Sequence, residues 1–180
     1  MFYKRIQLFV ALLVPLALTA EPVLEEVVVS ARKVDENLQD VPIGMTVFTT
    51  SEVEDAGIER PEDFIALTPN VVMANTVNVG DTLVTIRGIT STRDAESNFA
   101  FVVDGVLQTN PNAFNRELLD IAQIEVLKGP QGALYGRNAS SGAILITTKE
   151  PSGEGYSRVT VGFGNNDATK FQYVTDGNLS

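Results

Sequence analysis

The segment from Ile124 to Lys149, IEVLKGPQGALYGRNASSGAILITTK, constrains the fold more than any other part of this 180-residue chain. Its two apolar runs, Ile124–Leu127 and Ala143–Thr148, are rich in Ile, Val and Thr and are typical of buried strands. The loop between them is rich in glycine, which permits positive φ angles and a close approach of backbones. The residues alone predict a strand–loop–strand unit, which many α/β domains contain.

Several kinds of chemistry are excluded by composition. The chain has no His and no Cys, so it has no Ser-His-Asp triad, no His or Cys zinc site and no disulfide. The glycine-rich loop continues from Gly136 into Arg137-Asn138, whereas a phosphate-binding loop would end in Gly-Lys-Ser/Thr. With 23 acidic and 13 basic residues the net charge is −10, which disfavours nucleic-acid binding. We therefore expect a protein that is not an enzyme, that carries no cofactor or metal and that has no nucleic-acid partner.

The glycine-rich segment also resembles the signature near the end of the plug domain of TonB-dependent outer-membrane receptors. In that family a strand, the phrase KGPQG-LYG-NA, a second strand and a Lys-x-Pro exit recur in this order. The matching residues here are Lys128–Gly132, Leu134–Gly136, Asn138-Ala139 and Lys149–Pro151. The chain departs from the family at Ser141-Gly142, where members often carry Gly-Gly. The phrases TIRGI and VVDGV occur upstream in family order, so the resemblance extends over roughly Glu25 to Pro151.

The first 20 residues follow the pattern of a secretory signal peptide. Lys4 and Arg5 give a positively charged start, Leu8–Leu18 is mostly apolar, and Ala20 offers a small residue at the cleavage point. About eleven apolar residues are too few for a membrane-spanning helix, which needs ~20. We expect residues 1–20 to direct export and to be removed.

The segment after the signal peptide contains the β-branched triplet Val27–Val29, which favours an extended conformation. An ordinary first strand would explain it. In the context of the family it resembles a TonB box, which the inner-membrane energy-transducing protein TonB adds as a strand to its own sheet. The residues that this resemblance assigns to TonB are Glu25, Glu26, Val27, Val28, Val29, Ser30 and Ala31. We expect the segment to be flexible in the isolated protein, because nothing nearby in sequence obliges it to join the core.

The globular part predicts an α/β (α+β) fold, with one small mixed β-sheet and short helices, of the TonB-receptor plug type. Expected strands are Ile43–Phe48, Thr82–Ile86, Phe99–Val103, Ile124–Leu127 and Ala143–Thr148. Short helices are expected at Glu52–Ala56, where Ser51-Glu52-Val53-Glu54 has capping-box spacing, and at Pro61–Leu67, with Pro61 at the first helical position. Asp104-Gly105 predicts a two-residue hairpin turn.

The resemblance also implies roles for particular side chains. Charged residues at strand ends, including Glu125 and Lys128, ordinarily face water or form simple ion pairs. In the family, arginines of the IRG and YGRN phrases form ion pairs that seat the plug in its barrel, and Arg87 and Arg137 match those positions. Two polar loops, Ser91–Asn98 and Gln108–Arg116, are candidates for contact with the ligand. Their residues assigned to this role are Ser91, Thr92, Arg93, Asp94, Asn98, Gln108, Asn110, Asn112, Asn115 and Arg116.

Beyond Pro151 two alternating runs, Arg158–Gly164 and Ala168–Thr175, resemble the first hairpin of the barrel that follows a plug. A plugged barrel has about 22 strands, so we expect a truncated receptor or a plug-like protein acting alone, not a complete transporter. The expected organisation is a signal peptide (1–20), a TonB-box segment and linker (21–40), a plug (41–151) and a linker with the start of the barrel (152–180).

The resemblance implies a receptor in the outer membrane that imports a ferric siderophore or another scarce nutrient. Its partners would be TonB, an outer-membrane β-barrel formed by the rest of the receptor, and a small-molecule nutrient or metal chelate. TonB would pull the plug and open the pore. The alternatives are a soluble periplasmic module that engages TonB without transport, a gene fragment that does not transport, and an exported enzyme, which the lack of a catalytic constellation disfavours.

Overall fold

The computed structural model describes residues 26–30, 32–76, 82–92, 95–151, 155–165 and 168–177. The expected signal peptide lies outside the described residues, as do Glu25, Ala31, Arg93 and Asp94 of the candidate sites. No helix in the described part of the chain is both long and apolar enough to cross a membrane.

A five-stranded mixed sheet forms the centre of the molecule. In spatial order its strands are β3 (Met45–Thr49), β9 (Ile121–Lys128), β10 (Gly142–Thr148), β7 (Phe99–Val103) and β8 (Val106–Gln108). The β10–β7 pairing is parallel and the other three are antiparallel. The predicted strand–loop–strand unit is thus confirmed as β9 and β10. A side chain at Gly142 would collide with the carbonyl oxygen of Leu127 on β9, so glycine allows the two backbones their close approach.

The expectation of a single sheet is wrong. Thr82–Ile86 does form a strand, β5, but it belongs to a second, three-stranded antiparallel sheet. In that sheet β5 lies between β4 (Val71–Asn75), which the sequence did not predict, and β6 (Ile89–Thr90). A two-residue turn at Arg87-Gly88 joins β5 to β6, and both of its residues have positive φ. Because β4 pairs with one edge of β5 and β6 with the other, β5 has no free edge with which to join the central sheet.

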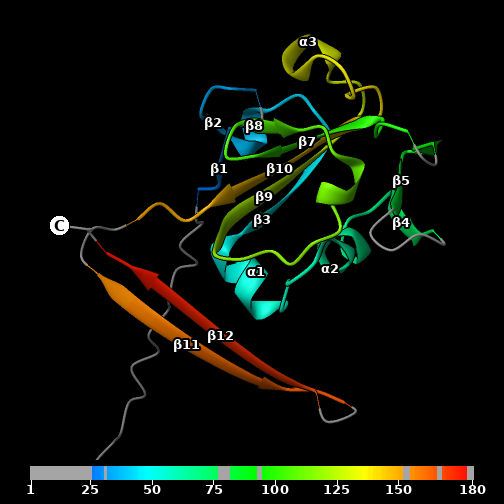
Figure 1. The fold of residues 1–180 in the computed structure, drawn as a ribbon. Coiled ribbons are helices and arrows are strands. Elements are labelled where there is room, and N and C mark those ends of the chain that lie inside the picture. Colours follow the sequence, from blue (N-terminus) through cyan, green and yellow to red (C-terminus); the bar gives the residue numbers. More distant parts are fainter. Residues whose placement is uncertain are drawn as a thin grey trace, which may run out of the picture.

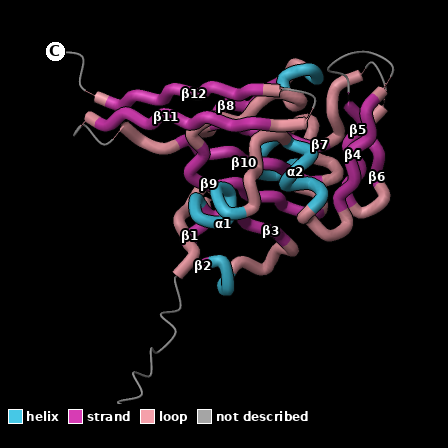
Figure 2. The backbone as a smooth tube through the Cα atoms, turned by 90° about the horizontal axis from the view of Figure 1, so that it is seen from below, coloured by secondary structure: helices cyan, strands magenta, loops and turns pink. Residues whose placement is uncertain are grey.

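Helices α1 (Thr50–Asp55) and α2 (Pro61–Ala66) cover one face of the central sheet, as Figures 1 and 2 show from two directions. A capping box exists, but it begins two residues earlier than predicted, at Thr49 instead of Ser51, with Glu52 as its reciprocal partner. Apolar residues of both helices pack with strand residues into the larger core, in which Phe48, Phe64, Phe99, Phe101 and Phe114 make ring-to-ring contacts. The short 3-10 helix η2 (Pro111–Ala113) precedes Phe114, which is only 2% exposed. The loop Gln108–Arg116, predicted to be polar, therefore contributes a central core residue.

The opposite face of the sheet carries a smaller apolar cluster that includes Leu127, Ala143 and Leu145. Two features lie over this side in Figure 1: helix α3 (Gly132–Tyr135), from the glycine-rich loop, and a short ribbon of β1 (Val28–Val29) and β2 (Glu36–Asn37). The 3-10 helix η1 (Leu38–Asp40) follows β2 directly. The central sheet is therefore covered on both faces.

The turn between β7 and β8 agrees with the prediction for Asp104-Gly105. Both residues have positive φ, 47° and 78°, as a two-residue hairpin turn of this kind requires. Asp104 also secures the neighbouring strand, because its carboxylate accepts hydrogen bonds from the amide (2.8 Å) and the hydroxyl (3.0 Å) of Thr148.

Beyond the body, β11 (Tyr156–Phe163) and β12 (Thr169–Asp176) pair along their whole length as an antiparallel hairpin. Figures 1 and 2 show it as a long ribbon outside the sheet and helices. The hairpin has two unlike faces, since side chains alternate along each strand. One face carries Arg158 and Lys170, which contact the body. The other carries Val159, Val161, Phe163, Phe171 and Tyr173, which are all largely exposed.

Candidate functional site

The N-terminal segment is docked on the body, which contradicts the expectation that it would be flexible. Val28 and Val29 pair with Asn37 and Glu36 of β2, and the Leu38 amide donates to the carbonyl oxygen of Val27 at 3.0 Å. Val29 is 1% exposed. The contacts that fix the segment come from β9, 95 residues further along the chain, and the local sequence gave no signal for them.

Two side chains of β9 bond to the edge of β1 that faces away from β2. The amide group of Gln123 donates to the carbonyl oxygen of Val28 at 3.0 Å. The carboxylate of Glu125 accepts from the backbone amide of Ser30 at 3.1 Å and from the Ser30 hydroxyl at 3.4 Å. Glu125 lies in the middle of β9 and is 1% exposed, so the interpretation of it as a strand-end charge facing water is wrong. Its carboxylate instead fixes the N-terminal segment.

Tyr135, from the LYG phrase of the signature, lies near the same place. Burial, followed by the negative charge of Glu125, raises the pKa of the Tyr135 hydroxyl to about 12. The ammonium group of Lys33 lies 5.7 Å from the centre of the Tyr135 ring, a cation–π distance. The glycine-rich loop therefore contributes to the surroundings of the chain that follows β1.

An open groove of about 420 Å³ runs beside the N-terminal segment. Its lining residues come from that segment, from the junction of β3 with α1, and from the start of β9: Glu26, Val27, Val28, Thr49, Thr50, Ser51, Glu54, Ala122 and Gln123. The exposed edge of Val28 and the amide side chain of Gln123 both border it. The groove gives solvent access to the edge of β1 that does not face β2.

The two arginines that the resemblance assigned to the barrel lie in different surroundings. The Arg87 guanidinium lies beside the backbone of Gly44 and Gly129. Burial, together with the charge of Arg87, lowers the pKa of Lys128, whose ammonium group donates to the Thr46 hydroxyl at 2.9 Å. Arg137 is exposed and forms an ion pair with Glu96 at 3.4 Å. Their expected role in seating a plug is tested by none of these contacts and stays a prediction.

Two of the candidate ligand residues contribute to the fold. Ser91 is buried, and its hydroxyl donates to the Asn98 side-chain oxygen at 2.8 Å. The same Asn98 oxygen accepts from the Ser141 hydroxyl at 3.1 Å, and the Asn98 carbonyl oxygen accepts from the Ser140 hydroxyl at 3.1 Å. Ser91 and Asn98 thus tie the first candidate loop to the end of the glycine-rich loop. Thr92 is exposed beside them.

The second candidate loop leaves the sheet at the same end. Because Gln108 lies opposite Phe101 on β7, β8 runs back toward Asn98 and delivers the loop there. Within it, Asn110 accepts a hydrogen bond from the Asn112 amide and so caps η2. The side-chain oxygen of Asn115 is buried without a hydrogen-bond partner among the described residues. Asn110, Asn112 and Arg116 are exposed, whereas Gln108 donates to the nearby carbonyl of Val106.

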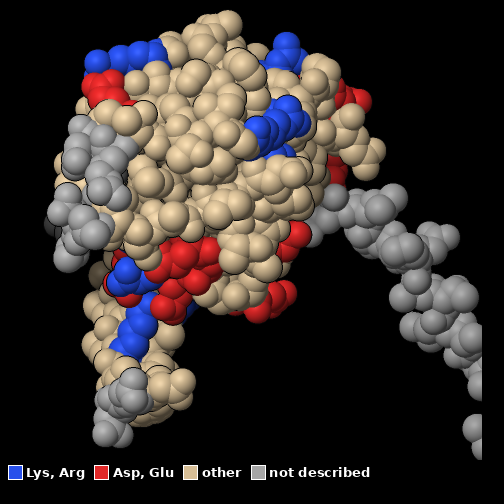
Figure 3. Space-filling model, turned by 90° about the vertical axis from the view of Figure 1, so that its right-hand side faces the viewer, with Lys and Arg blue, Asp and Glu red and all other residues tan. Residues whose placement is uncertain are grey.

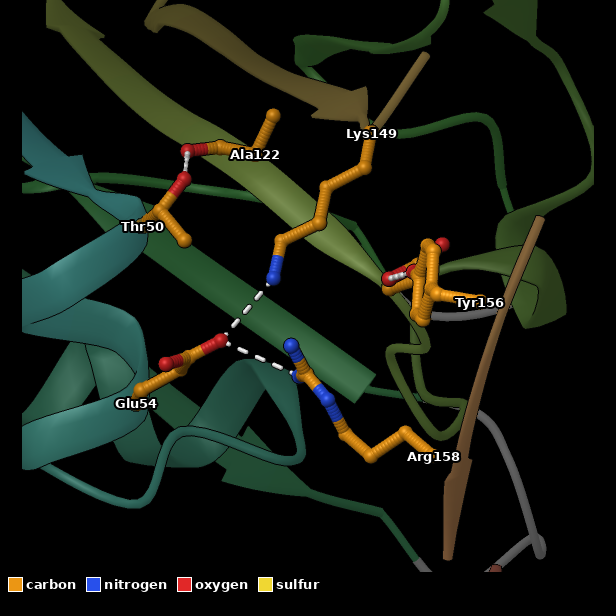
Figure 4. A network of polar contacts seen from close by, with 7 residues as sticks. Thr50, Glu54, Ala122, Lys149, Tyr156 and Arg158 are labelled. Carbon is orange, nitrogen blue, oxygen red and sulfur yellow. Dashed lines mark hydrogen bonds and ion pairs between the residues drawn. The ribbon is translucent and has the colours of Figure 1, made fainter. Parts of the chain in front are cut away.

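At the opposite end of the sheet, ion pairs connect the C-terminal hairpin to the body. Figure 4 shows the Glu54 carboxylate of α1 between the Lys149 ammonium (2.9 Å) and the Arg158 guanidinium (3.2 Å), with the Tyr156 hydroxyl donating to Asp120 nearby. Lys170 of β12 pairs with Glu59 at 2.8 Å and with Glu117 at 3.6 Å. In Figure 3 acidic side chains gather in the lower part of the body, on the side where the hairpin lies.

Comparison with known proteins agrees with this geometry. The family model of the TonB-dependent Receptor Plug Domain matches residues 37–143, more than half of the chain. The chain belongs to the TonB-dependent receptor plug family. The family model begins in β2 and ends two residues into β10, so it covers the other four strands of the central sheet, the second sheet and both candidate ligand loops.

Individual relatives are receptors and transporters and not enzymes. The chain is 29% identical over 136 residues to the pesticin receptor of Yersinia enterocolitica, covering 75% of this chain and 20% of the receptor. It is 35% identical over 153 residues to the vitamin B12 transporter BtuB of Vibrio vulnificus, covering 81% and 24%. Among solved structures, the ferric yersiniabactin uptake receptor FyuA from Yersinia pestis superposes with a TM-score of 0.69 at 28% identity, covering 76% and 22%. The chain thus spans about a fifth to a quarter of the length of these relatives.

Proposed function

We propose that this plug belongs to an outer-membrane receptor that imports a scarce nutrient, such as a ferric siderophore, and that TonB drives it. The observation that carries the proposal is the extended strand β1, which lies a few residues before the matched plug region, with one edge bordering an open groove. An accessible strand edge suits a partner that binds by adding a strand. The relatives include a ferric yersiniabactin uptake receptor and a vitamin B12 transporter, which supports nutrient import as the function.

The nutrient would contact the end of the sheet at which both candidate loops emerge. Thr92, Asn110 and Asn112 are exposed there and offer hydroxyl and amide groups. Arg116 lies toward the other end of the sheet, in a pocket with Val103 and Thr148, and is less suited to this contact. Ser91 and Asn98 would act indirectly, since they fix the first loop on the glycine-rich loop. A ligand can shift the plug only through a difference in affinity between two plug conformations. The hydrogen bonds of Asn98 to Ser91 and Ser141 connect the first candidate loop to the glycine-rich loop between β9 and β10. Through these bonds, binding of the nutrient would affect β9 and β10.

The C-terminal hairpin would form the start of the barrel wall. Its exposed apolar face suits lipid, and its polar face already contacts the plug through Arg158 and Lys170. A lipid-facing strand of an outer-membrane barrel alternates in this manner between apolar and polar side chains. Arg87 and Arg137 would contribute further contacts with that wall.

The experiment that tests the partner is a proline substitution in β1. Proline has no amide hydrogen and cannot donate to a ladder, so Val28→Pro should abolish binding of the periplasmic C-terminal domain of TonB in a calorimetric titration. The Val28→Ala variant keeps the amide and should bind as the unmodified chain does. Thermal melting of both variants should show little change, because Val28 is half exposed.

Two results would contradict the proposal. Normal binding by the proline variant would show that this segment is not the TonB contact. Global unfolding by the same variant would show that β1 is a core strand whose proper role is structural.

A further inference from the structure

The two edges of β1 are occupied in different ways. Toward β2 its backbone takes part in an ordinary antiparallel ladder, to which the Leu38 amide and the Val27 carbonyl belong. Because backbone groups alternate in direction along a strand, the Val28 carbonyl and the Ser30 amide point to the other edge. These two groups are bonded to the side chains of Gln123 and Glu125. A side-chain donor and a side-chain acceptor therefore stand where a neighbouring strand would place its own amide and carbonyl.

We propose that Gln123 and Glu125 gate strand addition at this edge of β1, so that an extended partner strand binds there by displacing the two side chains while β2 stays paired. The inference rests on the proposed partner being TonB. It adds which edge the partner strand takes and which residues oppose it. The spacing fits, because Gln123 and Glu125 are two residues apart on β9 and so point to the same face of the sheet.

The geometry of the groove supports the outer edge as the route of approach. Val28, Gln123 and the residues at the β3–α1 junction line the groove, so its solvent reaches the bond between Gln123 and Val28. The other edge of β1 is already paired with β2, and Leu38, the first residue of η1, continues this pairing through its bond to Val27. A partner strand that approaches through the groove would meet the edge of β1 that faces away from β2, and it would not need to separate β1 from β2.

The same hydrogen bonds modestly favour the state in which the outer edge of β1 is occupied by Gln123 and Glu125. A hydrogen bond of this type changes an equilibrium constant by roughly 2- to 12-fold. Removing one of the two side chains should therefore tighten partner binding by a factor in that range without creating any new contact. Gln123 is the better position for a test, because it is only partly buried, whereas Glu125 is almost wholly buried and its substitution would disturb the sheet.

The first experiment compares Gln123→Ala with a control, Gln172→Ala, which removes the same amide side chain from β12, away from β1. Each chain is titrated with the periplasmic domain of TonB in the absence of nutrient. We expect the dissociation constant of Gln123→Ala to fall by about 2- to 12-fold, and that of Gln172→Ala to stay at the value of the unmodified chain. An unchanged constant in Gln123→Ala, with measurable binding by the unmodified chain, overturns the gate and leaves the proposed function intact.

The second experiment asks which edge is used. The chain has no cysteine, so a Val28→Cys/Asn37→Cys double variant would form a single disulfide between β1 and β2. Val28 and Asn37 face each other at a position where the backbones exchange no hydrogen bond, which brings Cα atoms to a distance that suits a disulfide. We expect the oxidised and the reduced forms to bind TonB equally. Loss of binding on oxidation, restored by reduction, would show that the partner replaces β2 and would overturn the inference. Failure of every variant and of the unmodified chain to bind would refute the proposed function itself.

Discussion

Two β-ribbons, the short pair β1–β2 and the long hairpin β11–β12, are attached to the body by different kinds of contact. The ribbon β1–β2 lies against the sheet through a valine that is 1% exposed and through hydrogen bonds to a buried carboxylate. The hairpin β11–β12 does not contribute apolar side chains to the core, because the apolar face of the hairpin is exposed. Its attachment to the body consists largely of exposed ion pairs. Exposed ion pairs are worth about 0–1 kcal/mol each, and salt screens them.

The comparison shows which contacts give each ribbon its position. Burial of Val29 and desolvation of Glu125 make the site of β1 specific and insensitive to salt, because solvent and ions do not reach those groups. The hairpin contacts are polar and wet, so they can be exchanged for other partners at small cost. Its apolar face, with Phe163 at 84% exposed, has no partner of its own among the described residues. The first ribbon is thus held by buried contacts, whereas the second is held by exposed polar contacts and leaves its apolar face open to solvent.

The largest expected effect concerns Val29. Val29→Ala removes two buried methyl groups and leaves a small cavity, so we expect docking of β1–β2 to weaken by about 2 kcal/mol. The matched variant Val161→Ala, on the exposed face of β11, should change stability by less than about 0.5 kcal/mol. Urea unfolding gives the global values, and hydrogen exchange of the Leu38 amide, which bonds to Val27, reports on the ribbon itself. Equal small effects at both positions would mean that the ribbons are attached alike.

A second prediction compares two glycines of β-ribbons. Gly105 has φ of 78° at the β7–β8 turn, where a β-branched residue is strained, so Gly105→Val should destabilise the domain by more than about 1 kcal/mol. Gly162 lies inside β11 at an ordinary φ, and a side-chain carbon there would meet the Lys170 side chain at normal contact distance. Gly162→Val should therefore be nearly neutral. A melting temperature unchanged by Gly105→Val would show that the turn relaxes to another type.

Much of the central sheet could be predicted from the sequence, because its strands are continuous apolar runs bounded by turn residues. The runs at Phe99–Val103 and at the signature predict strands that the structure contains, with ends extended by no more than a few residues. The Asp104-Gly105 turn was predictable for a local reason, since few residue pairs tolerate two positive φ angles. Local rules thus predict strands and turns where neighbouring residues decide the conformation.

Long-range contacts account for what the sequence did not predict. Phe114 lies among asparagines in a polar loop and gives no periodic signal, yet it is central to the aromatic core. Glu125 belongs to an apolar strand, and Ser30, from the far end of the chain, donates hydrogen bonds to its buried carboxylate. Asn98 has the composition of a binding residue but bonds to Ser91 and Ser141. In each case the partner is distant in sequence, so neither pattern nor propensity identifies it.

The next prediction separates the two ribbons by ionic strength. Raising NaCl from about 0.05 M to about 0.5 M should loosen the hairpin from the body, because its ion pairs are exposed, and should leave β1–β2 in place. Since the chain has no native cysteine, fluorophore pairs can be placed through Ser51→Cys/Thr169→Cys for the hairpin and Ser51→Cys/Val34→Cys for the ribbon. We expect energy transfer to fall with salt in the first pair alone. A fall in the second pair would mean that β1–β2 also depends on exposed charges.

The smallest effect is the pH dependence of hairpin docking, measured with the same Ser51–Thr169 pair. The hydrogen bond and the charge of Lys149, and then Arg158, lower the pKa of Glu54 below its ordinary value of 4.5. Only the Arg158 part of this lowering depends on the hairpin, so Glu54 supports docking through Arg158 at pH values above 4.5, and this support is lost as the pH falls through its lowered pKa.

The pKa of Lys170 shifts in the opposite direction to that of Glu54, so its contribution to docking is lost at high pH. Its hydrogen bond to Glu59 raises its pKa above 10.5, so its contribution is complete below 10.5 and is lost as the pH rises through the raised value. Energy transfer should therefore be greatest between these limits and should decline at both extremes. The Glu54→Gln variant should show weaker docking near neutral pH and a smaller decline on the acid side, while the alkaline decline persists. If energy transfer declines at low pH as much in Glu54→Gln as in the unmodified chain, then another carboxylate causes the decline. Glu54 would then not be among the contacts that attach the hairpin.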